Sequence, residues 1–289
     1  AQLQQSFISW VQSMAKITEG QIISIDGKRM CHSGEQGKKG IIHMVSAWSN
    51  ANNMVLGQLK VNDKSNEITA IPALLDLLMV KGCWITIDAM GCQKDIARKI
   101  KEKEAEFILA VKDNQKHLHD DIQEAFKHGK IEQTHIQTHL DHGRIEKRTS
   151  RIITDMDWVC NQEDWHELKT LIEIKSERTI KATGITETQT RHYISSAVST
   201  AQKFNEAIRE HWGIENRLHW VLDVAFGEDD STKRAGTAAE NFSFMSKIAV
   251  NLLYQFKDKR GARKVSMKTK RKNAGLNNEY LVAIRANSV

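Results

Sequence analysis

The chain has 289 residues, of which 40% are hydrophobic and 27% charged, which is enough apolar material for one large domain with an insertion or for two modest domains. Its four cysteines form no CxxC pair, so neither a disulfide framework nor a thiolate zinc site is indicated, and a cytoplasmic location is expected. The longest apolar run, from Ile71 to Val80, is interrupted by Asp76 and is too short to cross a bilayer, so a soluble protein with no membrane partner is expected.

The formal net charge of +6 is concentrated at the C-terminal end. From Lys257 onward, ten Lys and Arg residues stand against only Asp258 and Glu279. Residues 257–289 are therefore predicted to form a basic tail, with two interpretations open: a solvated arm that contacts phosphates, or a disordered solubilising segment.

Three short β-rich runs predict an antiparallel meander near the N-terminus. The first strand is expected at about Ile22–Asp26, ending in the Asp-Gly turn signal, and the next two at residues 40–48 and 54–61, separated by the turn-rich SNANN. Residues 65–82 then change to helical periodicity, with Asn66 as a candidate cap and Gly82 after the end.

Strands and helices alternate in the next part of the chain. CWITIDAMG predicts a strand ending at Asp88, followed by a helix at 93–104 and a strand at 106–114. This order predicts an α/β fold with a mixed sheet covered by helices on both faces. Residues 115–202 predict a β-rich insertion with a helix near 118–127, and two helices follow, one around Glu215 and one at 237–257.

Two of the predicted strands end in an acidic residue, Asp26 and Asp88. Taken singly, an aspartate before a glycine-containing turn is most often a turn residue. Taken together, two carboxylates held at one end of a sheet form a negative cluster that a bound cation would make tolerable.

A third carboxylate lies in the stretch IREHWGIENRLHWVLDV, residues 208–224. At 3.6 residues per turn, one helix face would carry four polar residues, His211, Glu215, His219 and Asp223. The opposite face would carry the apolar residues Ile214, Leu218, Val221 and Ala225. Two interpretations stay open: a solvent-facing ridge with Trp212 and Trp220 packed beside it, or a helix that brings Glu215 to the two aspartates.

Three carboxylates without thiolates favour a hard cation, Mg²⁺ or Mn²⁺, and two such ions suit in-line displacement at phosphorus. His211 and His219 lie four residues to either side of Glu215, which is not the HExxH spacing of a zinc protease, so a zinc hydrolase is only weakly supported.

Several motifs occur in an order that resembles one family over nearly the whole chain: IDGKRMCHSG, IHMVSAW, TIDAMGCQKDIARKI, DHGRIEKR and REHWGIENRLHWVLDVAFGEDD. They are similar to the H-repeat-associated insertion-sequence transposases of bacteria, which are DDE-class enzymes with an RNase H-like core. The resemblance implies an RNase H-like mixed sheet flanked by helices, with a β-rich insertion before the glutamate-bearing helix. It divides the chain into a remnant of an N-terminal segment at 1–20, a catalytic core at 21–114 and 203–256, the insertion at 115–202 and the basic tail at 257–289.

The resemblance also implies roles for particular residues. Asp26, Asp88 and Glu215 fall on the catalytic, metal-binding positions, where two Mg²⁺ or Mn²⁺ ions are expected. The partners implied are double-stranded DNA, as element ends and target, and a second copy of the chain in a homodimer on DNA.

The phosphate-binding residues of related enzymes are not carried over. Their Tyr, Arg and Lys positions are taken here by Ile208, His211 and Leu222. Nearby substitutes are therefore hypothesised: Arg209, His211, Arg217 and His219.

Other candidates lie further from Glu215. Arg144, Lys147 and Arg148 sit on a predicted hairpin in DHGRIEKR, where a solvated edge strand is as plausible as a DNA contact. Asp223, two turns beyond Glu215, is expected to orient the metal ligands without binding the metal itself.

The sequence thus predicts a DDE transposase that cuts and transfers DNA strands with divalent metal. Two alternatives stay open: an inactive, transposase-derived DNA-binding protein, and a stand-alone metal-dependent nuclease.

Overall fold

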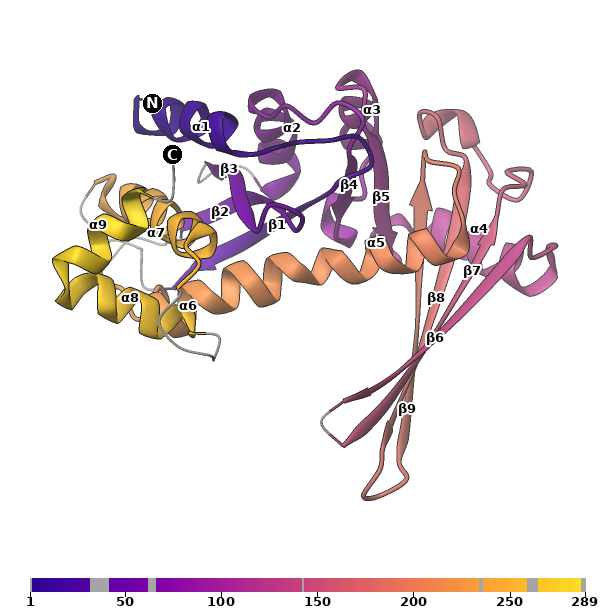
Figure 1. The fold of residues 1–289 in the computed structure, drawn as a ribbon. Coiled ribbons are helices and arrows are strands. Elements are labelled where there is room, and N and C mark those ends of the chain that lie inside the picture. Colours follow the sequence, from indigo (N-terminus) through magenta and orange to yellow (C-terminus); the bar gives the residue numbers. More distant parts are fainter. Residues whose placement is uncertain are drawn as a thin grey trace. The chain divides into compact units, whose positions relative to one another are not determined.

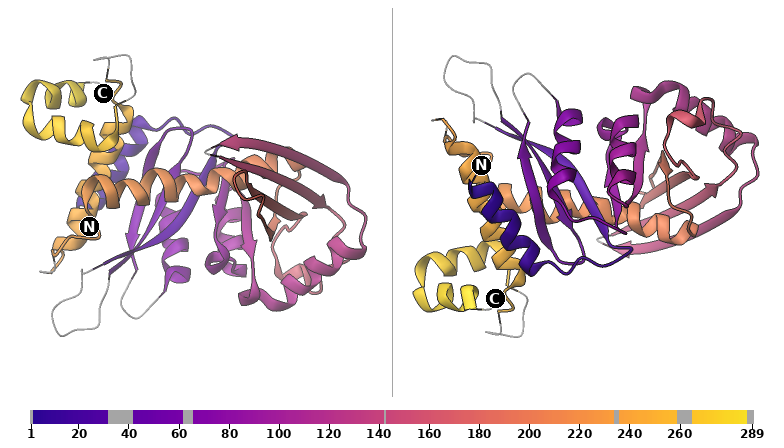
Figure 2. Two further views of the ribbon diagram at one scale, coloured as in Figure 1. Left: turned by 90° about the horizontal axis from the view of Figure 1, so that it is seen from below. Right: turned by 90° about the horizontal axis from the view of Figure 1, so that it is seen from above.

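The computed structural model describes residues 2–31, 42–61, 66–141, 143–233, 236–258 and 265–286, drawn in Figures 1 and 2. The chain divides into two compact units, residues 1–80 with 212–289 (the first unit) and residues 81–211 (the second unit). The expected catalytic core crosses this division. Residues 81–114 group with the expected insertion because strand β5 (Glu106–Val111) pairs directly with strand β9 (Thr186–Ser195).

The first unit is built on an antiparallel meander. Its strands are β1 (Ile22–Met30), β2 (Ile42–Ser49) and β3 (Met54–Lys60). β2 pairs with both of the others, as the three β-rich runs predict. Its helices are α1 (Gln2–Met14), α2 (Glu67–Leu77), the π-helix η4 (Ile214–His219), α6 (Trp220–Phe226), α7 (Ala238–Gln255), α8 (Met267–Leu276) and α9 (Asn278–Ala286).

Asp26 does not close its strand, so this expectation was wrong. β1 continues through Gly27 to Met30, and Asp26 pairs with Ser46 in the middle of the ladder. Gly27 is needed here for packing instead of for a turn, because a Cβ at this position would collide with the side-chain carboxylate of Glu67. The glycine thus allows the start of α2 to pack closely against the strand.

In the described residues 265–286, the basic C-terminal segment is helical and packed, so it is neither disordered nor fully solvated. Its contact with phosphates stays a prediction. α8 and α9 bring Tyr280 and Ile284 against Leu253 and Phe256, and all four side chains are buried. Lys270 donates hydrogen bonds from Nζ to the carbonyl oxygens of Leu253 and Phe256. Apolar burial thus holds a segment that charge alone would predict to be solvated.

The second unit contains a mixed sheet with strand order β4-β5-β9-β8-β7-β6. β4 and β5 are parallel, and the remaining pairs are antiparallel. Beyond β5 and β9, its strands are β4 (Trp84–Ile87), β6 (Gln133–Asp141), β7 (Arg144–Ile153) and β8 (Thr170–Ile180). Its helices are η1 (Ala89–Gly91), α3 (Lys94–Glu102), η2 (Asp113–Gln115), α4 (Lys116–His128), η3 (Gln162–Asp164) and most of α5 (Ala201–Gly213).

The expected β-rich insertion is present as the long ladder β6–β9, which extends beyond the body of the second unit (Figure 1). α/β units and the insertion before the Glu215 helix therefore match the predicted fold class. Among the described residues, no helix is long and apolar enough to cross a membrane.

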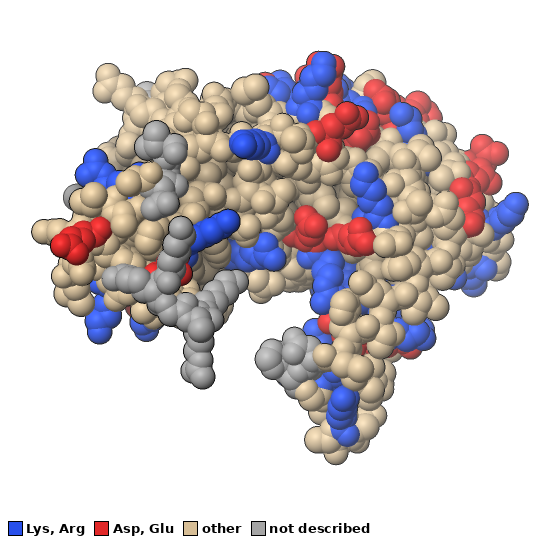
Figure 3. All heavy atoms as spheres, viewed as in Figure 1, with Lys and Arg blue, Asp and Glu red and all other residues tan. Residues whose placement is uncertain are grey.

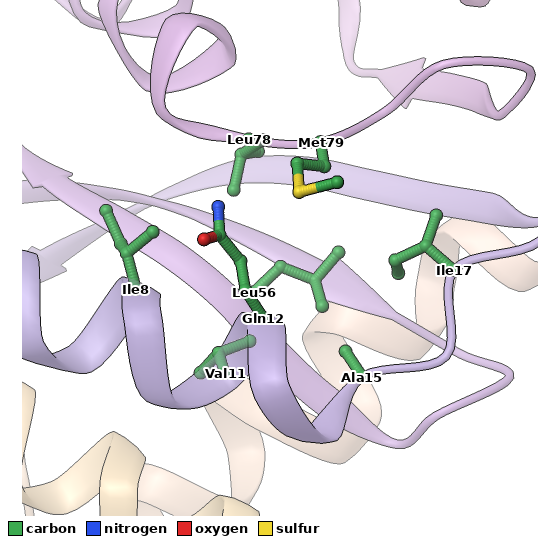
Figure 4. A pocket seen from close by; sticks show the side chains of 8 residues that line it. All are labelled: Ile8, Val11, Gln12, Ala15, Ile17, Leu56, Leu78 and Met79. Carbon is green, nitrogen blue, oxygen red and sulfur yellow. The ribbon is translucent and has the colours of Figure 1, made fainter.

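A hollow of about 140 Å³ lies in the first unit beside α1. It is lined by apolar side chains that include Ile8, Val11, Leu56 and Leu78 (Figure 4). The lining includes no ionisable side chain, so the hollow offers nothing for chemistry at phosphorus.

Candidate metal centre and nucleic-acid contacts

Three side chains from β1 and η4 converge in the first unit: Asp26, Glu215 and His219. The Nδ1 atom of His219 lies 3.0 Å from Oε2 of Glu215 and 3.6 Å from Oδ2 of Asp26. One ligand atom of each residue lies within 4.8 Å of the others. Two carboxylates and an imidazole at this spacing are a suitable donor set for a divalent cation.

β1 holds Asp26 on a rigid strand. Its Oδ1 accepts a hydrogen bond of 2.9 Å from the backbone N–H of Gly27, while Oδ2 faces His219. The side chain is about a quarter exposed, so Asp26 is both fixed and accessible.

A π-helical turn, η4, carries Glu215 and His219. It follows Gly213, where a Cβ would collide with the side-chain amide of Asn50. Asn50 in turn accepts a hydrogen bond of 3.0 Å from Nε1 of Trp48. The helix therefore approaches the sheet closely at Gly213, just before the π turn, a rare form that is frequent at functional sites.

Glu215 is held in its charged form. The hydrogen bond from His219 lowers the pKa of Glu215 most, burial raises it in part, and the charges of His219 and Lys28 lower it further, so that the pKa lies below its ordinary value. An ionised carboxylate at neutral pH is the form that binds metal.

An ion pair connects the same strand and helical run a short distance away. Lys28, two residues beyond Asp26, places Nζ 2.7 Å from Oδ1 of Asp223 and 3.4 Å from Oδ1 of Asp229. Burial lowers the pKa of Lys28, but the hydrogen bond and charge of Asp223 outweigh it, with help from Asp229 and Glu228, and the net pKa is raised. Sequence reasoning missed Lys28, although its i+2 position on a strand places it on the face of Asp26.

A buried polar network lies in the same unit. Lys247 is fully buried on α7 and donates from Nζ to Ser243 Oγ at 2.8 Å, and Ser243 donates to Gln58 Oε1 at 3.1 Å. Burial lowers the pKa of Lys247 to about 8, while the nearby charge of Glu228 raises it in part. Glu228 is 1% exposed, and neither of its carboxylate oxygens has a hydrogen-bond partner among the described residues.

Asp88 lies in the second unit, directly after β4. Its Oδ1 accepts hydrogen bonds from the backbone N–H groups of Met90 (3.1 Å) and Gly91 (3.4 Å), which caps η1. Burial and the charge of Asp88 together raise the pKa of the Cys92 thiol. The carboxylate of Asp88 is exposed, and its role as a metal ligand stays a prediction.

The three candidates for DNA contact on the insertion differ in exposure. Arg144 is exposed, and Lys147 has a 47% exposed side chain with Nζ 3.3 Å from Glu177. Arg148 is 7% exposed and donates from Nε to Asn205 at 3.0 Å, so its guanidinium packs inside the unit. β7 lies between β6 and β8, so the expectation of an edge strand at this motif was wrong. Lys and Arg side chains are visible along the projecting end of the ladder (Figure 3).

The substitutes near Glu215 also have different surroundings. Arg209 is 43% exposed, and His211 Nδ1 lies 2.9 Å from Thr86 Oγ1. Arg217 is exposed and donates to Asn53 Oδ1 at 3.0 Å. His219, by contrast, is 3% exposed and faces the carboxylates, which places it in the metal site and away from the surface.

The two tryptophans of this helical run are partly exposed to solvent. Trp212 is 42% exposed and Trp220 58% exposed. The four residues of the predicted apolar face, Ile214, Leu218, Val221 and Ala225, are all buried. The helix therefore buries its aliphatic face and leaves its aromatic rings at the surface.

The chain has an α/β fold with a mixed sheet and a β-rich insertion. Asp26, which precedes the insertion, and Glu215, which follows it, converge. These features define a protein of the DDE, RNase H-like class. A family model described as "Transposase DDE domain" matches residues 15–252. The chain belongs to this family of transposases.

Relatives share much of the chain. A protein of Escherichia coli O157:H7 named "Putative transposase YncI" is 48% identical over 97% of this chain and 73% of its own length. "H repeat-associated putative transposase YhhI" of Escherichia coli K12 is 39% identical over the whole of this chain and 77% of its own length. These matches confirm the predicted family.

One solved structure shares the fold. A piggyBac transposase in a synaptic complex with hairpin DNA superposes with a TM-score of 0.53 at 12% identity, over 96% of this chain. The chain spans 55% of the length of that protein. The similarity confirms the predicted RNase H-like fold.

Proposed function

We propose that the chain cuts DNA at the ends of an insertion element and joins the freed 3′ ends to a target, using divalent metal held by Asp26, Asp88 and Glu215. The observation that carries this proposal is the convergence of Asp26 and Glu215, from elements far apart in the sequence, on one imidazole. A transposase family and a DNA-bound structural relative support it.

Within this proposal the protein residues have distinct tasks. Asp26 and Glu215 offer anionic oxygens from a strand and a helix, and Asp88 offers a third from the end of β4. When bound, Mg²⁺ or Mn²⁺ ions, two in this proposal, stabilise the attacking and the leaving oxygen at phosphorus. The Lys28–Asp223 ion pair holds β1 against α6 and so fixes the spacing of the carboxylates.

The test is a DNA assay with the full chain. Labelled duplexes carrying the terminal sequences of the element are incubated with target plasmid and Mg²⁺ or Mn²⁺. We expect cut and joined products from the wild type, and a loss of at least about 100-fold in Asp26→Asn, Asp88→Ala and Glu215→Gln. Asp95→Asn, which neutralises an 85% exposed carboxylate on α3, is the matched control and retains activity.

Three other results of this assay would each contradict a different part of the proposal. Strand transfer by the Asp88→Ala protein refutes the assignment of Asp88. Cleavage without joined product indicates a nuclease, and salt-sensitive binding without cleavage indicates an inactive DNA-binding protein. Light scattering of the protein with its end DNA tests the proposed homodimer, which joining two ends to one target requires.

DNA binding is proposed to use exposed cations of the insertion and of the Glu215 helix. Arg144, Lys147, Arg209 and Arg217 carry this part, since their side chains reach the surface. The slope of log affinity against log salt is negative, and each lost phosphate contact reduces its magnitude by about 0.9. The pair Arg144→Gln with Lys147→Gln should therefore reduce this magnitude by about 2, whereas Lys127→Gln on α4 leaves it unchanged.

A further inference from the structure

We propose that His219 is a nitrogen ligand of the divalent cation held by Asp26 and Glu215, and that it shifts this site towards Mn²⁺ and away from Mg²⁺. The inference rests on the proposed function and deepens it. A set of carboxylates alone suits Mg²⁺, whose ligands are oxygens, whereas imidazole favours transition-metal ions.

The spacing of the donor atoms supports direct ligation. His219 Nδ1 lies 3.0 Å from Glu215 Oε2 and 3.6 Å from Asp26 Oδ2. Neighbouring ligands of an octahedral cation with metal–ligand distances near 2.1 Å lie about 3 Å apart. The nitrogen therefore occupies a position next to both carboxylates, where a third ligand belongs.

The charges in the site point the same way. The carboxylates of Asp26 and Glu215 both face the same nitrogen of His219. Two carboxylates at this spacing repel each other, and solvent screens part of the repulsion because the side chains of Asp26 and Glu215 are 24% and 53% exposed. A cation shared by all three groups removes this repulsion and uses each donor.

Burial of His219 fixes the orientation of its ring. Its side chain is 4% exposed, and Nε2 is buried with no hydrogen-bond partner among the described residues. The orientation of the ring is thus set by what Nδ1 faces and by packing. Packing therefore holds Nδ1 towards the two carboxylates, at 3.0 Å from Glu215 and 3.6 Å from Asp26.

The π turn explains how both side chains reach β1. Glu215 and His219 lie at the second and last positions of η4, while Ile214 and Leu218 remain buried behind them. A π turn contains an extra residue relative to an α turn, so it changes which side chains face a neighbouring element. Here it directs a carboxylate and an imidazole to the same aspartate.

The decisive experiment detects nitrogen coordination without measuring activity. The full chain is loaded with Mn²⁺ alone and studied by electron spin echo envelope modulation, which reports ¹⁴N bound to the ion. We expect ¹⁴N coupling in the wild type and in the control His43→Gln, from a histidine on β2, and none in His219→Gln. Mn²⁺ affinity, measured from the free-ion signal, should fall at least about tenfold in His219→Gln, and Mg²⁺ affinity by less.

Two further measurements keep the proposal open to refutation if His219→Gln does not fold. Wild-type protein labelled with ¹⁵N-histidine must lose the ¹⁴N pattern, with no substitution made. The variant His219→Asp, which offers an oxygen in place of the nitrogen, should bind Mg²⁺ more tightly relative to Mn²⁺ than the wild type does.

The outcomes separate this inference from the proposed function. Bound Mn²⁺ without nitrogen coupling, together with intact strand transfer, overturns the role of His219 and leaves the proposed function standing. Absence of Mn²⁺ binding in the wild type overturns both. Coupling that persists in His219→Gln overturns the assignment to this histidine.

Discussion

Substitution of the buried Lys247 is expected to raise the free energy of unfolding, whereas most core substitutions lower it. Its side chain is fully buried on α7, and burial lowers its pKa from 10.5 to about 8. This lowering means that the charged lysine costs the folded state about 3 kcal/mol at pH 7 relative to a neutral group. Lys247→Met keeps the length of the side chain, removes the charge and gives up one hydrogen bond to Ser243, worth about 1 kcal/mol. We expect a net stabilisation of about 2 kcal/mol at pH 7.

The pH dependence identifies the cause. Between pH 8 and 10.5 the unfolded chain binds more protons at this lysine than the folded chain, so the wild type gains stability as pH rises. The advantage of Lys247→Met should therefore shrink by about 2 kcal/mol between pH 7 and pH 9.5. Urea unfolding followed by circular dichroism measures both quantities, with Lys127→Met, a lysine with a 66% exposed side chain, as control within about 0.5 kcal/mol of wild type.

A Lys247→Met protein that is less stable at pH 7, with the same pH dependence as the wild type, would refute this reasoning. That result would mean that Glu228 forms a strong pair with the charged lysine. The double variant Lys247→Met with Glu228→Gln isolates this contribution, because it removes both buried charges at once.

Three more predictions follow from individual contacts. Lys28→Met leaves Asp223 partly buried without its cation, so we expect a loss of about 2–4 kcal/mol in urea unfolding, and Asp223→Asn in the same background should restore part of it. Arg148→Met should lower stability by about 1–3 kcal/mol, because it leaves a buried amide without its partner, and should leave the salt dependence of DNA binding unchanged. In native protein, iodoacetamide followed by mass spectrometry should label the exposed Cys160, whereas the buried Cys92, whose pKa is raised by burial and by Asp88, should react only after unfolding.

Periodicity predicted most of the elements because it reports burial directly. The three strands of the meander, α2, α3, β5 and α4 lie where alternating and helical patterns place them. The ends were less predictable. Asp26-Gly27 has the composition of a turn, but the glycine is used to admit the Glu67 carboxylate, a tertiary contact that a local pattern does not contain.

Charge was misleading at the C-terminal end. The Lys- and Arg-rich composition indicated solvation, yet Tyr280 and Ile284 reach a buried cluster with Leu253 and Phe256. The long stems of lysines can cover apolar surface while their charged ends find partners, as Lys270 does with two carbonyl oxygens. Composition therefore describes such a segment less well than the spacing of its few apolar residues.

The candidate site was predictable in its acids and less so in its other members. Asp26 and Glu215 were identified from strand ends, helical spacing and resemblance, and the structure brings them together. Lys28 was missed because a lysine on a strand carries no motif. The burial of His219 was missed because a regular helix of 3.6 residues per turn does not describe a π turn.

Two opposite electrostatic arrangements connect β1 with the helical run that follows Gly213, and their difference bears on function. Lys28 and Asp223 neutralise each other at 2.7 Å, so this link is complete within the protein. Asp26 and Glu215 both face Nδ1 of His219, at 3.6 and 3.0 Å, so this link brings two carboxylates to one imidazole. Because the Lys28–Asp223 ion pair fixes the distance between the same two elements, Asp26, Glu215 and His219 are held at a spacing that suits a metal ion before the ion binds. Loss of the Lys28 ion pair should therefore weaken Mn²⁺ binding as well as folding, which separates a preorganised site from one that forms only when metal arrives.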